Sequence, residues 1–333
     1  MKISIREVAE RAKVSHATVS RVLNNVDVPI APETRRLVRH IAAEMGYQPN
    51  RAARALATGR TQTIALWSIN LRSTFYGDVI YYTHEEIERH GYELFVSSVH
   101  SMHGSTVDTP KLFSWPVDGI LAVDLPRGTI PGLTNSLLDG RPFVHIGAYL
   151  FEGTDYVQVD FKQQAAGAVR HLADIGCKRI AYLVPDWFAW FQEVNDDRLG
   201  GYKQGIADLG REPEIIKTEN EKREDVPSAL KSYIDLHGCP DGLFCYNDDM
   251  AIAAYPTLLD MGMRIPEDVA LVGCNGIRDT GYTNPPLSTI MQPIEQMCAM
   301  AWAFLKQRID DPQLPLQQIV LQPHLDIRGS SLR

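Results

Sequence analysis

The chain lacks the long uncharged apolar runs that a signal peptide or a membrane span requires. Its start, MKISIREVAERAKVSH, carries a charge every few positions, and no later stretch approaches about 18 uncharged apolar residues. The cysteines form an odd set without a CxxC pair, so neither a disulfide framework nor a zinc site is expected. They are Cys177, Cys239, Cys245, Cys274 and Cys298. The sequence predicts a cytoplasmic protein with buried free thiols and no membrane association.

The chain also lacks a complete catalytic or cofactor-binding motif. No GxGxxG loop, P-loop lysine motif or GxSxG elbow occurs. In HEEIERH, residues 84–90, Glu88 stands where the second histidine of a zinc-binding HExxH pair should be, so we interpret the segment as one face of an amphipathic helix. The NDD triplets at 195–197 and 247–249 are interpreted as helix starts, where carboxylates favour the positive end of the dipole. The sequence predicts no enzyme, no cofactor and no metal.

Charge is distributed unevenly along the chain. The 333 residues exceed what one hydrophobic core usually supports, so two or three domains are expected. Behind the net charge of -8, residues 1–60 hold 11 Lys and Arg against 5 Asp and Glu, a balance of +6, which leaves -14 for the remainder. A confined positive module supplies the phosphate attraction that DNA binding requires, whereas an acidic body disfavours indiscriminate polyanion binding.

The first sixty residues have the pattern of three short helices. Apolar residues over 5–12 recur at the spacing of an amphipathic helix, and after a short turn Ser15 is placed to cap a second helix, HATVSRVLNN. A third helix is expected to begin at Pro32 and to stop at Gly46. The second helix would bury Val19, Val22 and Leu23, and the third would run through Thr34, Leu37, Val38 and Ile41.

The outward face of the second predicted helix has the character of a surface that reads DNA. It carries His16, Ala17, Ser20, Arg21 and Asn24. A helix that exposes polar residues after a tight turn fits the major groove, where Arg21 can reach a guanine edge. The alternative is a three-helix accessory domain whose exposed arginines are merely solvated. The ordered turn, the second helix and the local charge all favour DNA binding.

Beyond Arg60, short apolar runs alternate with amphipathic stretches, which predicts successive βαβ units and two doubly wound lobes with parallel sheets. The predicted strands are TIALWSI, ELFVSSV, VDGILAV, FVHIGAY, KRIAYLV, DGLFCYN and DVALVGCN. Open sheets of this kind bind ligands beyond the carboxyl ends of their strands. The candidate residues there are Phe75, Tyr76, Trp187, Trp190, Arg198, Asn247, Asp248, Asn275 and Gln292.

This candidate set suits a sugar ring, because aromatic faces stack on C–H groups while planar polar groups bind hydroxyls. Two alternatives stay open. Phe75 and Tyr76 could instead fill the core, and Trp187 and Trp190 could pack or form a lid between the lobes.

Two segments, VAERAKVSHATVSRVLNN and ETRRLVRHIAAEMGYQPNRAARALATGRTQTIAL, closely resemble the N-terminal signature of the LacI/GalR family of repressors. The resemblance continues through GAVRHLADIGCKRIAYL, RLGGYKQGI, YNDDMAIAAY and GMRIPEDVALVGCNGI to PPLSTIMQPIEQM. It implies an N-terminal all-α helix-turn-helix headpiece and a two-lobed α/β domain like that of periplasmic sugar-binding proteins. The implied domains are the headpiece 1–48, a hinge helix and linker 49–60, a first lobe 61–160 plus 290–320, and a second lobe 161–289 plus 321–333, with crossings near 161, 289 and 320.

The same resemblance assigns roles in DNA binding. His16, Ala17 and Arg21 would face bases, and the residues implied to touch phosphates or sugars are Ser15, Thr18, Ser20 and Asn24. The implied hinge helix, with Asn50, Ala53 and the minor-groove wedge Leu56, is too short to be stable alone and would order when paired on DNA.

Two residues depart from the family pattern in this module. Ala31 stands where a serine commonly caps the third helix. Ala17 has no hydrogen-bonding group, which shifts base reading to His16 and Arg21.

For the effector, the resemblance implies contacts from Arg198 and from Asp160, the first member of the usual Asp–Asn pair. Asn275 and Gly147 replace typical aspartates, and Phe161 replaces the asparagine of that pair. A sugar or sugar derivative is the first expectation, although fewer carboxylates would equally suit an anionic or less hydroxylated molecule.

The implied function is a repressor that binds double-stranded, near-palindromic operator DNA as a homodimer under control of this molecule. No C-terminal heptad follows the last predicted strand, so the tetramer-forming helix of some relatives is not expected. The sequence leaves open whether effector releases or promotes DNA binding. The alternative function is a cytoplasmic small-molecule-binding protein without specific DNA recognition.

Overall fold

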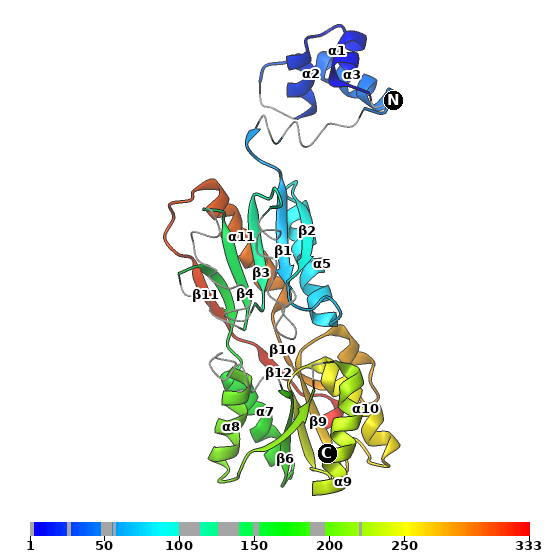
Figure 1. Ribbon diagram of the computed structural model, residues 1–333, viewed down its shortest axis with the longest axis vertical. Helices are drawn as coiled ribbons and strands as arrows, with labels where there is room; N and C mark the ends of the chain where they lie inside the picture. Colours follow the sequence, from blue (N-terminus) through cyan, green and yellow to red (C-terminus); the bar gives the residue numbers. More distant parts are fainter. Residues whose placement is uncertain are drawn as a thin grey trace. The chain divides into compact units, whose positions relative to one another are not determined.

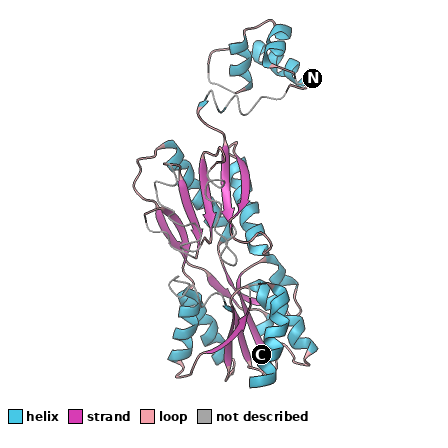
Figure 2. Ribbon diagram, viewed as in Figure 1, coloured by secondary structure: helices cyan, strands magenta, loops and turns pink. Residues whose placement is uncertain are grey.

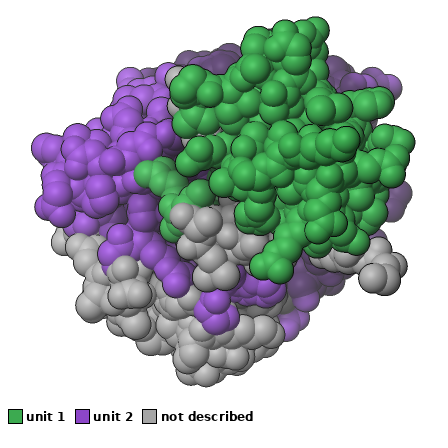
Figure 3. All heavy atoms as spheres, turned by 90° about the horizontal axis from the view of Figure 1, so that it is seen from above, with its two compact units in different colours: residues 1–62 green, residues 63–333 purple. Residues whose placement is uncertain are grey.

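The computed structural model describes residues 3–24, 28–47, 55, 58–99, 114–125, 140–148, 153–186, 197–219 and 222–333. The chain divides into two compact units, residues 1–62 and 63–333, which Figure 3 distinguishes by colour. Within the described ranges, no helix is long and apolar enough to cross a membrane.

The first unit contains helices α1 (Ile5–Ala12), α2 (His16–Leu23) and α3 (Pro32–Glu44), as the sequence predicts. α1 begins with a capping box, in which the Ser4 hydroxyl accepts from the Glu7 amide and the Glu7 carboxylate accepts from the Ser4 amide. Lys13, with a left-handed φ of 52°, ends α1 and turns the chain toward α2. The small core consists of Val8, Ala9, Ala12, Val19, Val22, Val38, Ile41 and Ala42.

Two features of α3 bear on the sequence predictions. Ala31 precedes the helix without a side-chain cap, and Pro32 starts it, as expected. Leu37 is part of the helix but 46% exposed, because the turn of α3 that faces the core is occupied by Val38, Ile41 and Ala42.

The first lobe of the second unit is built on a six-stranded sheet in the order β11-β5-β4-β3-β1-β2. Its strands are β1 (Thr63–Ser68), β2 (Glu93–Ser98), β3 (Gly119–Val123), β4 (Phe143–Gly147), β5 (Asp155–Val159) and β11 (Gln318–Leu321). Every neighbouring pair is parallel. Helices α5 (Thr74–Glu88) and α11 (Ile294–Asp310) pack against each other and against this sheet (Figure 1). The helical cover explains why β3 and β4 are buried along their whole length.

The second lobe has a second six-stranded sheet, in the order β12-β10-β9-β8-β6-β7, which is parallel except for the antiparallel pair of β10 and β12. Its strands are β6 (Ile180–Pro185), β7 (Glu214–Thr218), β8 (Gly242–Cys245), β9 (Ala270–Asn275), β10 (Ser288–Met291) and β12 (His324–Asp326). Helices flank both faces of this sheet (Figure 2). They are α7 (Lys162–Asp174), α8 (Asp197–Asp208), α9 (Val226–His237) and α10 (Asp248–Asp260), with the 3₁₀ segments η3 (Arg223–Asp225), η4 (Arg278–Tyr282) and η5 (Gly329–Ser331).

The chain passes between the two lobes three times: after β5, after β10 and after β11. The lobes therefore share three connections, and the first sheet receives its edge strand β11 only after the chain has built most of the second. This two-lobed α/β body with a helical headpiece confirms the predicted fold class.

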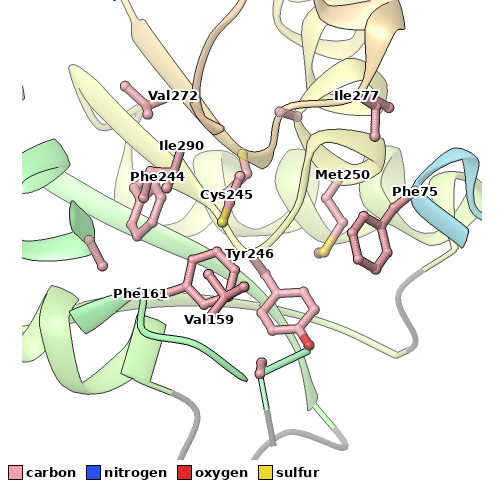
Figure 4. Close-up of a cluster of buried hydrophobic side chains, with 14 of the residues drawn as sticks. Phe75, Val159, Phe161, Phe244, Cys245, Tyr246, Met250, Val272, Ile277 and Ile290 are labelled. Carbon is pink, nitrogen blue, oxygen red and sulfur yellow. The ribbon is translucent and has the colours of Figure 1, made fainter. Parts of the chain in front are cut away.

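The apolar core continues across the lobe junction. One cluster contains buried side chains from both sheets. Figure 4 shows Phe75, from α5 of the first lobe, beside Met250 of α10 in the second. All five cysteines are free thiols, and all except the partly exposed Cys239 are buried. Desolvation raises the pKa of Cys177 to about 11 and of Cys298 to about 12.

Candidate DNA-binding and effector-binding sites

Helix α2 exposes the side that was predicted to read DNA. His16, Ala17 and Arg21 are exposed at its surface. The Ser15 hydroxyl accepts a hydrogen bond from the Thr18 amide at 3.0 Å and lies 2.8 Å from the Thr18 hydroxyl, so it caps the helix as predicted. The capped first turn directs its free amides and its exposed side chains outward, which is the arrangement that a major-groove helix needs.

Two further predicted contacts lie near the end of α2. Ser20, within the helix, and Asn24, directly after it, are partly exposed, and Asn24 Nδ2 donates to Ser20 Oγ at 3.3 Å. The hinge residues Asn50, Ala53 and Leu56 lie outside the described residues, as do Trp187 and Trp190 of the predicted effector site. Their roles stay predictions.

The remaining predicted effector residues gather where the two sheets meet. The carboxyl ends of the parallel strands of both sheets point to the lobe junction, and the ends of β1, β5, β6, β8, β9 and β10 with the segments after them supply these residues (Figure 1). They are Phe75, Tyr76, Asp160, Arg198, Asn247, Asn275 and Gln292, of which Arg198 is in the first turn of α8.

Arg198 is held between two aromatic rings. Its guanidinium carbon lies 4.4 Å from the ring centre of Phe161 and 4.5 Å from that of Tyr246. Its Nη1 donates to the Tyr246 carbonyl at 3.1 Å, and only 4% of the residue is exposed. The two rings help to orient the guanidinium, so any contact from Arg198 to a ligand must come from the N–H groups at the edge of its planar group. Phe161, which replaces the asparagine of the family pattern, thus supports the arginine instead of binding a ligand by hydrogen bonds.

The position of Arg198 depends on close packing between α8 and α7. A Cβ at Gly201 would lie 2.3 Å from the Lys162 carbonyl oxygen, and one at Gly205 would lie 2.8 Å from the Cβ of Val169. The two glycines allow α8 to approach α7 closely enough to place the first turn of α8 beside Phe161. The glycines of the motif RLGGYKQGI are therefore required for the close packing of α8 against α7.

We expect Gly201→Ala to push α8 away from α7. The clash with backbone should reduce the free energy of unfolding by about 1–3 kcal/mol and move Arg198 away from its aromatic partners. Gly200→Ala is the matched control, because its Cβ meets nothing within 4 Å, and helix propensity should make it slightly stabilising. Urea unfolding of both variants measures the difference. Equal stability of the two would contradict the packing argument.

Asp248, which the sequence predicts both as part of a helix start and as a residue of the ligand site, organises the second-lobe side of the junction. Its carboxylate accepts from the Thr289 hydroxyl at 2.6 Å and from the amides of Gly276 at 2.6 Å and Ile277 at 2.9 Å. Burial raises its pKa to about 6, against the lowering effect of these hydrogen bonds. One side chain thus ties α10, the loop after β9 and β10 together. The neighbouring Asn247 caps α10, with Oδ1 accepting from the Met250 amide at 2.8 Å.

Asn275 and Gln292 form a buried amide pair at the ends of β9 and β10. Gln292 Nε2 donates to Asn275 Oδ1 at 2.9 Å, and each residue is 7% exposed. Asn275 has a φ of 119°, an unusual value for a residue with a side chain. The side-chain amide nitrogen of Asn275 is the group that can donate to a ligand acceptor.

The structure explains why a glycine stands at position 147. Asp124, at the end of β3, turns its carboxylate toward β4 and accepts from the Ala148 amide at 2.8 Å. A Cβ at Gly147, whose φ is 116°, would lie 2.0 Å from Asp124 Oδ1. A side chain at 147 is therefore excluded, and the first-lobe carboxylate at this edge comes from Asp124, which sequence reasoning missed.

The other predicted first-lobe residues lie at or near this edge. Phe75 and Tyr76 are 2% and 7% exposed, with ring centres 5.1 Å apart, and belong to the apolar cluster. Asp160 is partly exposed, and its Oδ1 accepts from the Lys162 amide at 2.9 Å at the start of α7.

Two other features lie away from the junction. A pocket of about 190 Å³ opens at the amino ends of β4 and β5, the opposite edge of the first sheet. At its base Arg308 forms a buried ion pair with Asp155 at 2.9 Å. On α5, ligand-type atoms of His84, Glu85 and Glu88 lie within 4.8 Å of one another, and the two outer residues are exposed. The expectation that this helix holds no metal stays a prediction.

These features define a class: a helix-turn-helix regulator with a two-lobed periplasmic-binding-protein-like body. Residues 4–50 match the family model "Bacterial regulatory proteins, lacI family", and residues 169–331 match a periplasmic binding protein-like domain. The regulator CelR of Thermobifida fusca is 30% identical over 340 residues, covering 98% of each chain. The chain belongs to the lacI family of bacterial regulatory proteins.

Other relatives agree with this assignment. Catabolite control protein A of Staphylococcus epidermidis is 28% identical, over 99% of this chain and 100% of that one. A solved CelR–cellobiose complex is 27% identical with a TM-score of 0.69, covering 99% of this chain and 100% of that one. A Lac repressor dimer bound to operator shares the fold, with a TM-score of 0.85 at 21% identity over the full length of both chains. These relatives are transcription regulators, and the chain is a DNA-binding transcription regulator of the same family.

Proposed function

We propose that this protein is a repressor whose homodimer binds a near-palindromic operator under control of a hydroxylated small molecule, a sugar or sugar derivative, at the lobe junction. The observation that carries the ligand proposal is the buried Arg198 guanidinium, which packs over the rings of Phe161 and Tyr246. The amide pair Asn275–Gln292 lies at the carboxyl ends of the same second-lobe sheet. Such planar donors and aromatic rings suit hydroxyl groups on a compact ring. The cellobiose complex of the related CelR supports this choice of ligand class.

The proposed control acts through the two lobes. A ligand that binds one lobe arrangement more tightly shifts the population toward it. The first lobes of a dimer, connected to residues 49–60, would then set the spacing of the two recognition helices on the duplex. In this proposal residues 1–48 read DNA, 49–60 form the hinge, and the predicted lobe boundaries hold. Catalysis has no part in it.

Selection of DNA tests the first half of the proposal. The full-length protein should enrich a near-palindrome from a pool of random duplexes, and its affinity should exceed that for bulk DNA by about 10³-fold or more at physiological salt. A plain small-molecule-binding protein would enrich nothing at any salt concentration.

A thermal-shift screen tests the second half. Neutral mono- and disaccharides that include cellobiose and ribose, sugar phosphates and nucleosides would be added to the full chain. A true ligand at about 100 times its Kd should stabilise the protein by about 2.7 kcal/mol, which shifts the unfolding temperature by several degrees. A response to sugar phosphates alone would mean that the ligand is an anionic sugar derivative and not a neutral sugar. No response across the panel would end the proposal for this ligand class.

A further inference from the structure

A serine of the first lobe donates its hydroxyl to a carboxylate of the second. Ser73 immediately precedes α5, where a serine ordinarily accepts a hydrogen bond from the first turn of its own helix. Here it makes no such cap. Instead its Oγ donates to Oδ2 of Asp249 at 2.6 Å, across the lobe junction. The Ser73 hydroxyl therefore connects the two lobes and does not cap its own helix.

Asp249 is held in place from its own lobe. Its side chain is 9% exposed, and Oδ1 accepts from Arg223 Nε at 2.9 Å and Nη2 at 2.5 Å. Arg223 Nη2 also lies 3.6 Å from Asp279 of η4. Arg223 therefore orients this carboxylate from within the second lobe, independently of the contact with Ser73.

Two further ion pairs cross the junction beside this contact. Arg278 of η4 lies 3.1 Å from Asp78 of α5, whose carboxylate is buried. Arg72 lies 3.3 Å from Glu224 of η3, with both side chains exposed, so this pair contributes little stability. The start of α5 and the two residues before it thus contact three separate parts of the second lobe: η3, α10 and η4.

The contact lies next to the proposed ligand site on both sides. Asp249 is in the first turn of α10, two residues after Asn247 and one after Asp248. Ser73 directly precedes the turn with Phe75 and Tyr76. A rotation of one lobe against the other would break a hydrogen bond of 2.6 Å completely, because its energy falls steeply with distance and angle. The hydrogen bond is therefore present in one arrangement of the lobes and absent in the other, so it can distinguish two conformational states.

We propose that the Ser73–Asp249 hydrogen bond, with Arg223 as its support, is a latch that fixes the lobe arrangement described here and through which occupancy of the junction alters operator affinity. The proposal rests on the proposed function, since it makes these residues positioning residues for that control. The competing explanation is that Asp249 only anchors Arg223 within the second lobe and that Ser73 is an incidental neighbour.

The test compares Ser73→Ala with Ser73→Thr, which keeps the hydroxyl, and with Ser228→Ala as a matched control. The Ser228 hydroxyl donates to the Asp225 carbonyl at 3.1 Å inside one lobe. Hydrogen exchange of the full chain without DNA or added ligand gives the first readout. Ser73→Ala should speed exchange both in residues 74–78 and in 222–226, whereas Ser73→Thr and Ser228→Ala should leave the first of these segments unchanged.

The second readout is affinity for the duplex that the wild-type protein selects. Ser73→Ala should change it by about fivefold or more, the lower end of a typical allosteric coupling, and Ser73→Thr should restore it. Faster exchange confined to α5, or an affinity equal to wild type, would overturn the latch. If the wild type selected no duplex, the proposed function would fail, and the exchange result alone would decide whether the contact joins the lobes.

Discussion

Replacing Arg21 by alanine is expected to remove selection of one operator position while leaving ligand affinity at wild-type level. Arg21 is exposed near the end of α2, and its neighbour on the reading face, Ala17, cannot form side-chain hydrogen bonds. A bidentate arginine–guanine pair contributes about 1–3 kcal/mol of discrimination, so affinity for the selected duplex should fall about 5- to 150-fold. Affinity for random DNA should fall far less, because the substitution removes only one positive charge that attracts phosphates.

Arg36→Ala is the matched control for this change. Arg36 is also exposed in the first unit, but it lies on α3 and pairs with Glu33 at 3.6 Å. It should lower affinity for all duplexes alike or not at all. Gel shifts with the selected duplex and its single-base variants distinguish the two. If both substitutions reduced selectivity at the same base position, α2 would not be the recognition helix.

Replacing Arg198 by methionine should have the opposite effect, a loss of ligand binding with effector-free DNA selection retained. Methionine fills the space between Phe161 and Tyr246 without any donor, which limits the packing loss. Hydrogen bonds from a charged group contribute about 1.5–3 kcal/mol, so the ligand Kd should rise about 10- to 150-fold. Calorimetric titration with whichever sugar of the panel raises the unfolding temperature provides the measurement. An unchanged Kd in a folded variant would remove Arg198 from the site.

Hydrophobic patterning was sufficient to predict most of the fold. Runs such as TIALWSI and VDGILAV became β1 and β3 because a parallel sheet covered by helices needs strands that are apolar throughout. Pattern reading omitted β5, β7, β10, β11 and β12. In β5 and β7, with the sequences DYVQV and EIIKT, polar residues interrupt the apolar run, and the other three strands are only three or four residues long. The pairing of β10 with β12 is antiparallel, and three-residue β12 gives too short a signal to predict.

The position of the candidate residues at the lobe junction was predictable from the sequence, but their geometry was not. Position at a strand end identified Asn247, Asn275 and Gln292, because topology alone brings such ends together. Nothing in the sequence indicated that Asn275 and Gln292 would bind each other, since that requires the register of β9 against β10. Likewise, Asp124 follows an ordinary strand, and only the missing Cβ of Gly147 makes room for it. The one signal in the sequence that could have indicated the role of Asp124 was a glycine at the end of one strand together with an aspartate at the end of another.

The discontinuous first lobe has a consequence for how the protein is made. Its edge strand β11 begins at Gln318, after every strand of the second sheet except β12. A nascent chain leaving the ribosome therefore exposes the unpaired edge of β5 until translation is almost finished, and such an edge can pair with another polypeptide. A stop codon just before Gln318 would leave that edge open permanently, so the shortened product should collect in inclusion bodies even though every predicted ligand- and DNA-contacting residue is already present.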